Sequence, residues 1–106
     1  MISNTPPPPY YAVIFSTVRT TNTDGYAEIN ALMNALALQQ KGFLGMENAS
    51  SEIGISISYW NDLEAIKRWK NNLEHQEALA EGQKRWYKHY KVRIAKVERD
   101  YEFLKK

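Results

Sequence analysis

The chain has 106 residues, 25% of them charged, no cysteine and a net charge of +2 at neutral pH. That length is typical of one domain, and the lack of cysteine excludes disulfides, thiolate metal sites and a cysteine nucleophile. No stretch approaches the roughly 20 apolar residues of a membrane-spanning helix, and no basic-then-apolar leader begins the chain. We therefore expect one cytoplasmic domain that has no membrane partner.

The first nine residues predict a tail, and the domain should occupy residues 10–106. Pro6–Pro9 cannot donate backbone hydrogen bonds and favour an extended conformation. Tyr10–Arg19 then predicts a strand, because its alternating faces are both largely apolar. Such a strand is expected to be covered on both sides.

A helix should follow from about Gly25 to Gln40. Apolar residues recur there at helical spacing. Gly42 can adopt the left-handed conformation that ends a helix. The predicted buried stripe consists of Ile29, Leu32, Met33, Leu36 and Ala37.

Two strands and a second helix come next. Phe43–Ala49 and Ile53–Trp60 predict strands with a short connection, which favours a hairpin. The second helix should run from about Leu63 to Trp86, with a possible break near Asn71–His75, and Tyr90–Val97 predicts the last strand. The helical stripe expected to face the sheet consists of Ile66, Trp69 and Leu73.

The order of these elements predicts an α+β, ferredoxin-like fold, β-α-β-β-α-β. It implies a four-stranded antiparallel sheet with two helices on one face. The other face would then be bare, and Tyr11 and Phe15 are too apolar to leave there in water. A homodimer that packs two sheets face to face, a dimeric α+β barrel, would bury them.

The C-terminal part of the chain is basic. After Gly82 the sequence holds nine lysines and arginines against three acids. A basic end can attract nucleic acid, but these residues are spread along the sequence and no RNA-binding motif accompanies them. We interpret them as a solvated helix end and an exposed sheet face, and expect no nucleic-acid partner.

Several segments together resemble the antibiotic biosynthesis monooxygenase domain family. The resemblance implies the dimeric α+β barrel and, from some members, oxidation of an electron-rich phenol or hydroquinone by dioxygen without a cofactor. The segments that carry it are Tyr10–Phe15, Gln40–Gly45, Ser58–Trp60, Glu64–Trp69 and Glu74–His75, and Val92–Tyr101 resembles one branch of the family.

Other members of that family degrade haem. They use an Asn on the first strand, a Trp early in the second helix and a His about three turns later as the iron ligand. Trp69 matches the Trp, but the first strand has no Asn. The position of the iron ligand falls near Leu79, about one turn after His75, which argues against haem chemistry.

Trp69 and His75 are the leading candidates for a site that binds a small aromatic molecule. Trp69 could stack on a flat substrate, and His75 could accept its proton as a general base. In an unbroken helix, however, His75 would lie roughly 120° from Trp69 and could be a surface or interface histidine instead. Arg93 or a tyrosine hydroxyl could hold the substrate oxyanion.

The remaining candidates for substrate binding are aromatic, and each of them could equally be core. They are Trp60, Tyr11, Tyr59 and Trp86. We expect a structural role for His89 at the last helix–strand junction. No metal site is expected, because the two histidines are far apart and no ligand spacing such as H-x3-H is present.

The leading hypothesis is therefore a homodimeric, cofactor-free monooxygenase that acts on a small phenol or quinol. The first alternative is a non-catalytic dimer that binds a small aromatic ligand or serves in stress or assembly. Haem binding or degradation is the weaker alternative.

Overall fold

The computed structural model describes residues 1–106 except the side chain of Leu73, so the predicted orientation of that side chain lies outside the described part. Four strands form one antiparallel sheet in the order β2-β3-β1-β4. The elements are β1 (Tyr10–Arg19), α1 (Tyr26–Leu38), β2 (Phe43–Ser50), β3 (Gly54–Trp60), α2 (Leu63–Lys70), α3 (Leu73–Arg85) and β4 (Tyr87–Val97).

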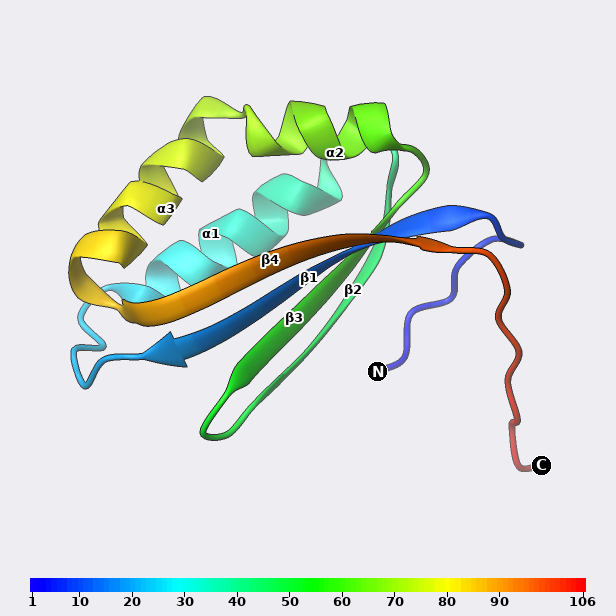
Figure 1. The fold of residues 1–106 in the computed structure, drawn as a ribbon, viewed down its shortest axis with the longest axis horizontal. Coiled ribbons are helices and arrows are strands. Elements are labelled where there is room, and N and C mark those ends of the chain that lie inside the picture. The colour runs from blue at the N-terminus through cyan, green and yellow to red at the C-terminus, as the bar shows by residue number, and fades with distance from the viewer.

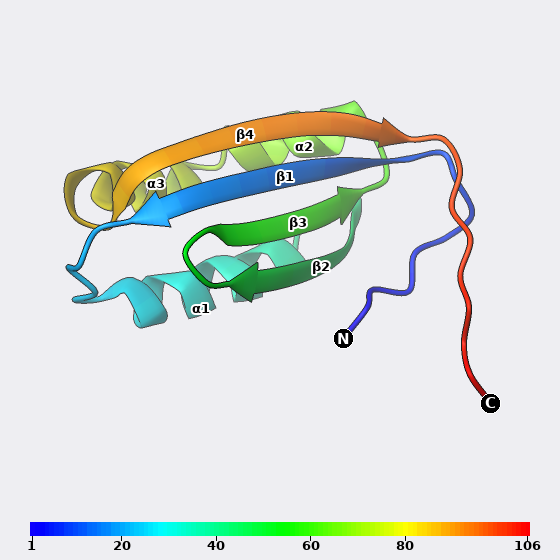
Figure 2. The same ribbon diagram turned by 60° about the horizontal axis from the view of Figure 1, so that its bottom comes forward.

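The helices cover one face of this sheet and leave the other face without a helix (Figures 1 and 2). The predicted ferredoxin-like order and the β2–β3 hairpin are confirmed. The second predicted helix is two helices, α2 and α3, which meet at an angle in Figure 1.

The break between α2 and α3 occurs where the sequence places two asparagines. The side chain of Asn72 accepts a hydrogen bond of 3.1 Å from the backbone N–H of His75, which makes Asn72 the N-cap of α3. Asp62 caps α2 in the same way, through a 2.8 Å bond from the backbone N–H of Ala65. Each cap satisfies a backbone donor that the first turn of a helix cannot pair internally.

The inward face of α1 follows the predicted stripe except at Leu32. Ala37 is fully buried as expected, but Leu32 is 49% exposed, so its predicted burial is wrong. The helix begins beside Trp86, whose ring contacts Tyr26 edge-on at 5.6 Å. Ile29 and Met33 line the cavity, as the stripe predicts.

The two faces of β1 point in the directions opposite to those expected from the sequence. Tyr11 and Phe15 lie on the helix side, where Tyr11 packs against the core cluster and Phe15 contacts Tyr87 and Tyr90. The bare face instead carries Ile14, which is directly opposite Ile57 of β3. The face without helices therefore has an aliphatic patch at Ile14 and Ile57.

The main core cluster lies at the end of the sheet under α2. Trp60, Ala65 and Ile66 are buried there. The chain passes close to this cluster at Gly42, which has φ 89°, and a Cβ added at Gly42 would lie 2.7 Å from the Cβ of Ala65. Glycine is required at this position by both its left-handed backbone and the close approach.

The N-terminal segment returns beside the sheet, whereas the C-terminal tail leaves the sheet at the end of β4 (Figures 1 and 2). Near the N-terminus, the backbone N–H of Ser3 donates to Glu47 at 2.8 Å. Near the C-terminus, the hydroxyl of Tyr10 donates to Asp100 at 2.6 Å. Beyond that contact Tyr101 and Phe103 are 93% and 87% exposed. No helix in the described part of the chain is both long and apolar enough to span a bilayer.

Candidate functional site

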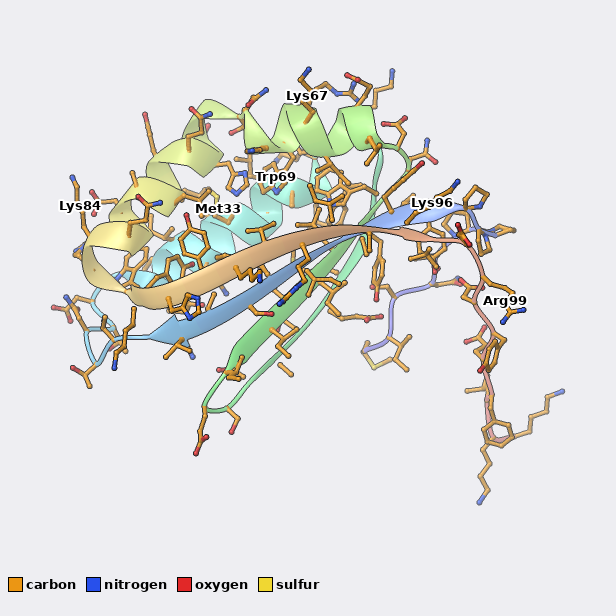
Figure 3. The ribbon with its side chains drawn as sticks, in the orientation of Figure 1. Met33, Lys67, Trp69, Lys84, Lys96 and Arg99 are labelled. Carbon is orange, nitrogen blue, oxygen red and sulfur yellow. The ribbon has the colours of Figure 1, made fainter. Side chains whose placement is uncertain are left out.

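A cavity of about 650 Å³ lies between the helices and the sheet. Its size is within the usual range of small-molecule sites. In Figure 3, Met33 and Trp69 lie in the region between helices and sheet, whereas Lys67 and Lys84 point away from it. The aromatic and imidazole side chains that line the cavity are Phe15, Tyr26, Trp69, His75, Trp86, Tyr87 and Tyr90.

His75 is held against Trp69 by two contacts. The imidazole stacks on the indole with ring centroids 4.4 Å apart and planes 19° apart. Its Nδ1 lies 2.8 Å from the backbone carbonyl oxygen of Trp69. Because a carbonyl oxygen can only accept, Nδ1 must carry the proton, and the neutral ring then has its lone pair on Nε2.

The burial of His75 favours its uncharged form. Desolvation lowers the pKa of His75 below its ordinary value of 6.5, and the hydrogen bond to the Trp69 carbonyl opposes this only in part. The imidazole is therefore neutral at pH 7 and has an unprotonated Nε2. Such a group can accept a proton from a ligand in the cavity.

The break between the helices places His75 in this position. A continuous helix would put His75 about a third of a turn away from Trp69. The chain instead changes direction at Asn71 and Asn72, so the first turn of α3 folds back over the end of α2. The two residues that carry the catalytic hypothesis are thereby brought into contact.

A second group of aromatic residues lines the cavity near β4. Phe15 contacts Tyr87 at 5.6 Å and Tyr90 at 5.2 Å between ring centroids, and these two tyrosines contact each other at 5.5 Å. Burial raises the pKa of Tyr87 to about 12, so its hydroxyl keeps its proton at neutral pH. These rings form a second aromatic wall with hydroxyl groups.

Simple alternation along β4 does not place Tyr87 and Tyr90 on the same face. A β-bulge does so, because Arg19 pairs with Tyr87 while Val18 pairs with His89, which leaves Lys88 as an extra residue. A bulge of this kind shifts every residue before it to the other face. The sequence carries no clear signal for it, so the cavity role of Tyr87 was missed.

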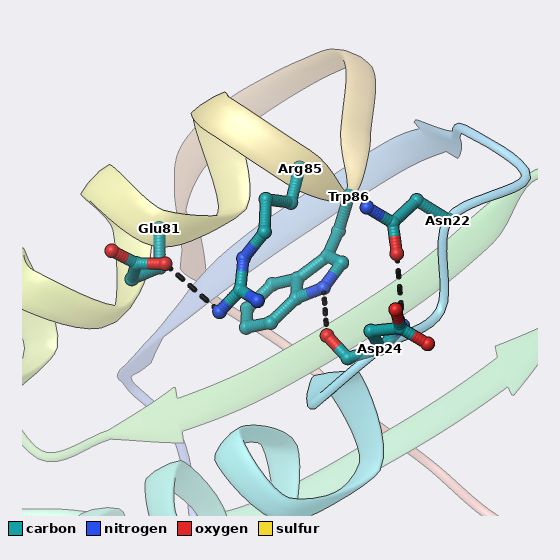
Figure 4. Close-up of polar contacts among 5 residues, drawn as sticks. All are labelled: Asn22, Asp24, Glu81, Arg85 and Trp86. Atoms are coloured by element: carbon teal, nitrogen blue, oxygen red, sulfur yellow. Dashed lines mark hydrogen bonds and ion pairs between the residues drawn. The ribbon is translucent and has the colours of Figure 1, made fainter.

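Trp86 borders the cavity but is chiefly a structural anchor. It is 1% exposed, and its indole N–H donates to the backbone carbonyl of Asp24 at 2.8 Å (Figure 4). Arg85 lies over its ring at 5.1 Å and pairs with Glu81 at 2.9 Å. The start of α1 is thereby tied to the end of α3.

Two more of the aromatic candidates lie in the core cluster and not among the residues that line the cavity. Trp60 is fully buried between Phe43 and Trp69, and its indole N–H donates to the hydroxyl of Ser58 at 2.8 Å. Tyr11 packs against the same cluster. Trp60 therefore supports Trp69 from behind.

Arg93 and Tyr59 lie on the opposite side of the sheet from the cavity. Arg93 pairs with Ile14, and Tyr59 pairs with Ala12, both of which point away from the helices. The hydroxyl of Tyr59 donates to Glu47 at 2.8 Å, and burial raises the pKa of Tyr59 to about 12. The structure thus separates these two side chains from His75 by the thickness of the sheet.

The residues of the cavity do not fit the donor set of a haem-degrading site. The cavity-facing residues of β1 are Val13, Phe15, Thr17 and Arg19, so no amide lies there. Leu79, which also lines the cavity, offers no iron ligand. Among the described side chains, no group of three His, Asp or Glu could hold a metal ion.

Residues 16–96 match the family model described as Monooxygenase af470-like. The chain belongs to this monooxygenase family. A relative in Bacillus subtilis, the "Uncharacterized protein YqjZ", is 48% identical over 100 residues, which cover 92% of this chain and 88% of that protein. The resemblance to the antibiotic biosynthesis monooxygenases is confirmed.

Solved structures show the same fold in proteins of this type. SnoaB from Streptomyces nogalater, a cofactor-independent oxygenase, has a TM-score of 0.74 at 10% identity and covers 86% of this chain and 95% of its own. A candidate antibiotic biosynthesis monooxygenase from Nitrosomonas europaea has a TM-score of 0.69 at 10% identity, with 87% and 92% covered. At 10% identity, these structures show only that the fold is shared with this chain.

Proposed function

We propose that this chain is a cofactor-independent oxygenase that acts on a small phenol or hydroquinone. The observation that carries the proposal is the neutral imidazole of His75, which is stacked on Trp69 and has its proton on Nδ1, in the wall of an aromatic cavity. The activity that SnoaB's description gives for that protein, on the same fold, supports this choice of reaction.

The first step is removal of the phenolic proton by Nε2 of His75. The resulting anion is a far better electron donor to dioxygen than the neutral phenol. A phenol and dioxygen then give a quinone and water, so one oxygen atom enters the product and the other leaves as water. The protein contributes the base, holds the ring and keeps bulk water from the reacting carbon.

We assign the role of holding the substrate oxyanion to the hydroxyl groups of Tyr87 and Tyr90. From the sequence, this role was expected of Arg93 or a tyrosine hydroxyl. Tyr90 already accepts a hydrogen bond of 2.7 Å from the side-chain amide of Gln83, so its own hydrogen remains to be donated. The raised pKa of Tyr87 likewise keeps it a donor. Donors that are fixed before the reaction stabilise a developing oxyanion at little reorganisation cost.

The proposal includes a homodimer formed through the bare face of the sheet. Ile14 and Ile57 lie side by side on that face, and Ile55 on the same strand is 43% exposed. An apolar sheet face of this kind is typical of a protein contact. Two copies related by a twofold axis would cover it with the same surface from each partner.

Oxygen uptake with a panel of phenols and hydroquinones tests the reaction. Replacement of His75 by Gln should lower the rate by about 10²–10⁴-fold, the usual contribution of a general base. His89→Gln is the matched control, because His89 is exposed and pairs with Val18. In the wild type the rate should fall in acid only at a pH below the ordinary imidazole value of 6.5, because burial lowers the pKa of His75.

Equal rates in the two variants would remove His75 from the mechanism. Tight binding of several phenols without any oxygen uptake would instead support the non-catalytic aromatic-binding alternative, which the same aromatic cavity favours. Haem titration followed by visible absorbance tests the weaker alternative, and we expect no Soret band that depends on His75.

A further inference from the structure

Two asparagines of α1 border the cavity, Asn30 at an exposed position and Asn34 at a half-buried one. Asn30 and Asn34 are one helical turn apart and line the cavity together with Met33. Asparagine is a poor helix former because its amide competes for backbone hydrogen bonds. A leucine at either position would favour the helix. At the half-buried Asn34, helix propensity therefore gives no reason for an amide.

These amides also lack partners within the described contacts. The asparagine side chains that make hydrogen bonds there are Asn22 and Asn72. None of those bonds involves Asn30, Asn34 or Asn48, and Asn48 lines the same cavity from β2. The three amides thus keep their donors and acceptors for solvent or a ligand.

The amides and the catalytic candidate lie on different sides of the cavity. Helix α1 contacts β2, at one edge of the sheet, while α3, which carries His75, contacts β4 at the other edge. Asn34 and Asn48 also border a smaller hollow of about 240 Å³ next to the cavity, between α1 and β2. A ligand that reaches His75 from within the cavity would therefore extend toward the amides.

We propose that Asn30, Asn34 and Asn48 form an amide wall that selects aromatic ligands with a neutral oxygen substituent, a hydroxyl or carbonyl group, on the end remote from His75. An amide both donates and accepts hydrogen bonds and carries no charge. It therefore suits hydroxyl and carbonyl groups better than a carboxylate, which only accepts. This inference rests on the proposed aromatic-binding function and adds its specificity.

The test is a calorimetric titration without oxygen, so that binding is measured apart from turnover. The probes are naphthol, a dihydroxynaphthalene with its hydroxyls on opposite rings, and a hydroxynaphthoate with a carboxylate in place of the second hydroxyl. The wild type should bind the dihydroxynaphthalene about three- to tenfold more tightly than naphthol, the usual effect of one hydrogen bond. The hydroxynaphthoate should bind no better than naphthol.

The double variant Asn30→Leu, Asn34→Leu should lose this preference and still bind naphthol. Its melting temperature should equal or exceed that of the wild type, because leucine suits this helix face better. Gln76→Leu, at an exposed position of α3, is the control and should keep the preference.

The amide wall would be overturned by equal affinities of the wild type for naphthol and dihydroxynaphthalene. A destabilised double variant would also overturn it, because the amides would then be structural. Failure to bind any probe would do the same. A retained preference in a protein that consumes no oxygen would support the amide wall and remove the oxygenase proposal, so the two failures are distinguishable.

Discussion

His75 shows how burial of one side chain can set both the chemistry and the stability of a small protein. Its folded pKa is lowered, mainly by desolvation. The group therefore contributes stability above its unfolded pKa of about 6.5 that is lost as the pH falls through the folded value. The same desolvation keeps Nε2 unprotonated at neutral pH, as the proposed proton transfer requires.

This linkage gives a prediction for stability. Between about pH 7.5 and pH 5 the free energy of unfolding of the wild type should fall more steeply than that of His75→Gln, because the unfolded chain takes up the proton more readily. Urea denaturation at several pH values measures the difference. His89→Gln should keep the wild-type slope, and identical slopes for all three proteins would contradict the buried, neutral His75.

Gly82 is a residue whose small size positions a cavity side chain. It is buried in α3, and a Cβ there would overlap the ring of Tyr87. Gly82→Ala should therefore destabilise the protein by about 1–3 kcal/mol despite the better helix propensity of alanine. In a Tyr87→Ala background the same change should stabilise by up to about 1 kcal/mol. Thermal unfolding of the four proteins measures this coupling, and additive effects would show that the ring is not the obstacle.

At the scale of the secondary structure elements, the break between α2 and α3 matters most. The polar residues at Asn71 and Asn72 interrupt the helical pattern, so the sequence indicated a possible break. Only the structure shows that the turn after it stacks the imidazole of His75 on Trp69. That outcome depends on the angle between two helices, which packing against the sheet decides and local sequence does not.

The cap of α3 is therefore expected to affect both stability and rate. Asn72→Ala removes the acceptor for the His75 backbone N–H and should cost about 1 kcal/mol. It should also lower oxygen uptake, because the first turn of α3 carries the base. Asn72→Asp keeps a cap and should remain close to the wild type in both measurements. An alanine variant with unchanged stability would show that the cap does not hold the break.

In the other elements too, the sequence predicts the type and order of the element, and tertiary contacts decide which way its residues point. Alternating and helical periodicity predicted all four strands and α1 in the right order, because each pattern reflects burial on one side of a regular element. The sheet face of Tyr11 and Phe15 and the burial of Leu32 were assigned wrongly. Both depend on long-range contacts, which periodicity does not contain.

For the whole molecule, the main consequence is the apolar face left outside the sheet. Ile57 lies at its centre, opposite Ile14. A lysine there would have to be desolvated in the proposed dimer, which is costly for an unpaired charge. The proposed assembly therefore predicts that Ile57→Lys yields a folded monomer at micromolar concentration, while the wild type sediments as a dimer.

Ile53→Lys is the matched control for this experiment. Ile53 lies in the turn between β2 and β3 and is 55% exposed, so a lysine there should leave the dimer intact. A monomeric wild type at micromolar concentration would remove the proposed assembly.

The sequence by itself determined the order of the elements, the fold class and the family, because these follow from local periodicity and from motifs that are contiguous in the chain. Only the tertiary structure decided which residues form the site. Trp69 and His75 meet through a helix break, Tyr87 enters the cavity through a bulge, and Arg93 is excluded by the register of the sheet. A shift of one residue or a change in one helix angle reverses the side to which a residue points, and long-range packing sets both.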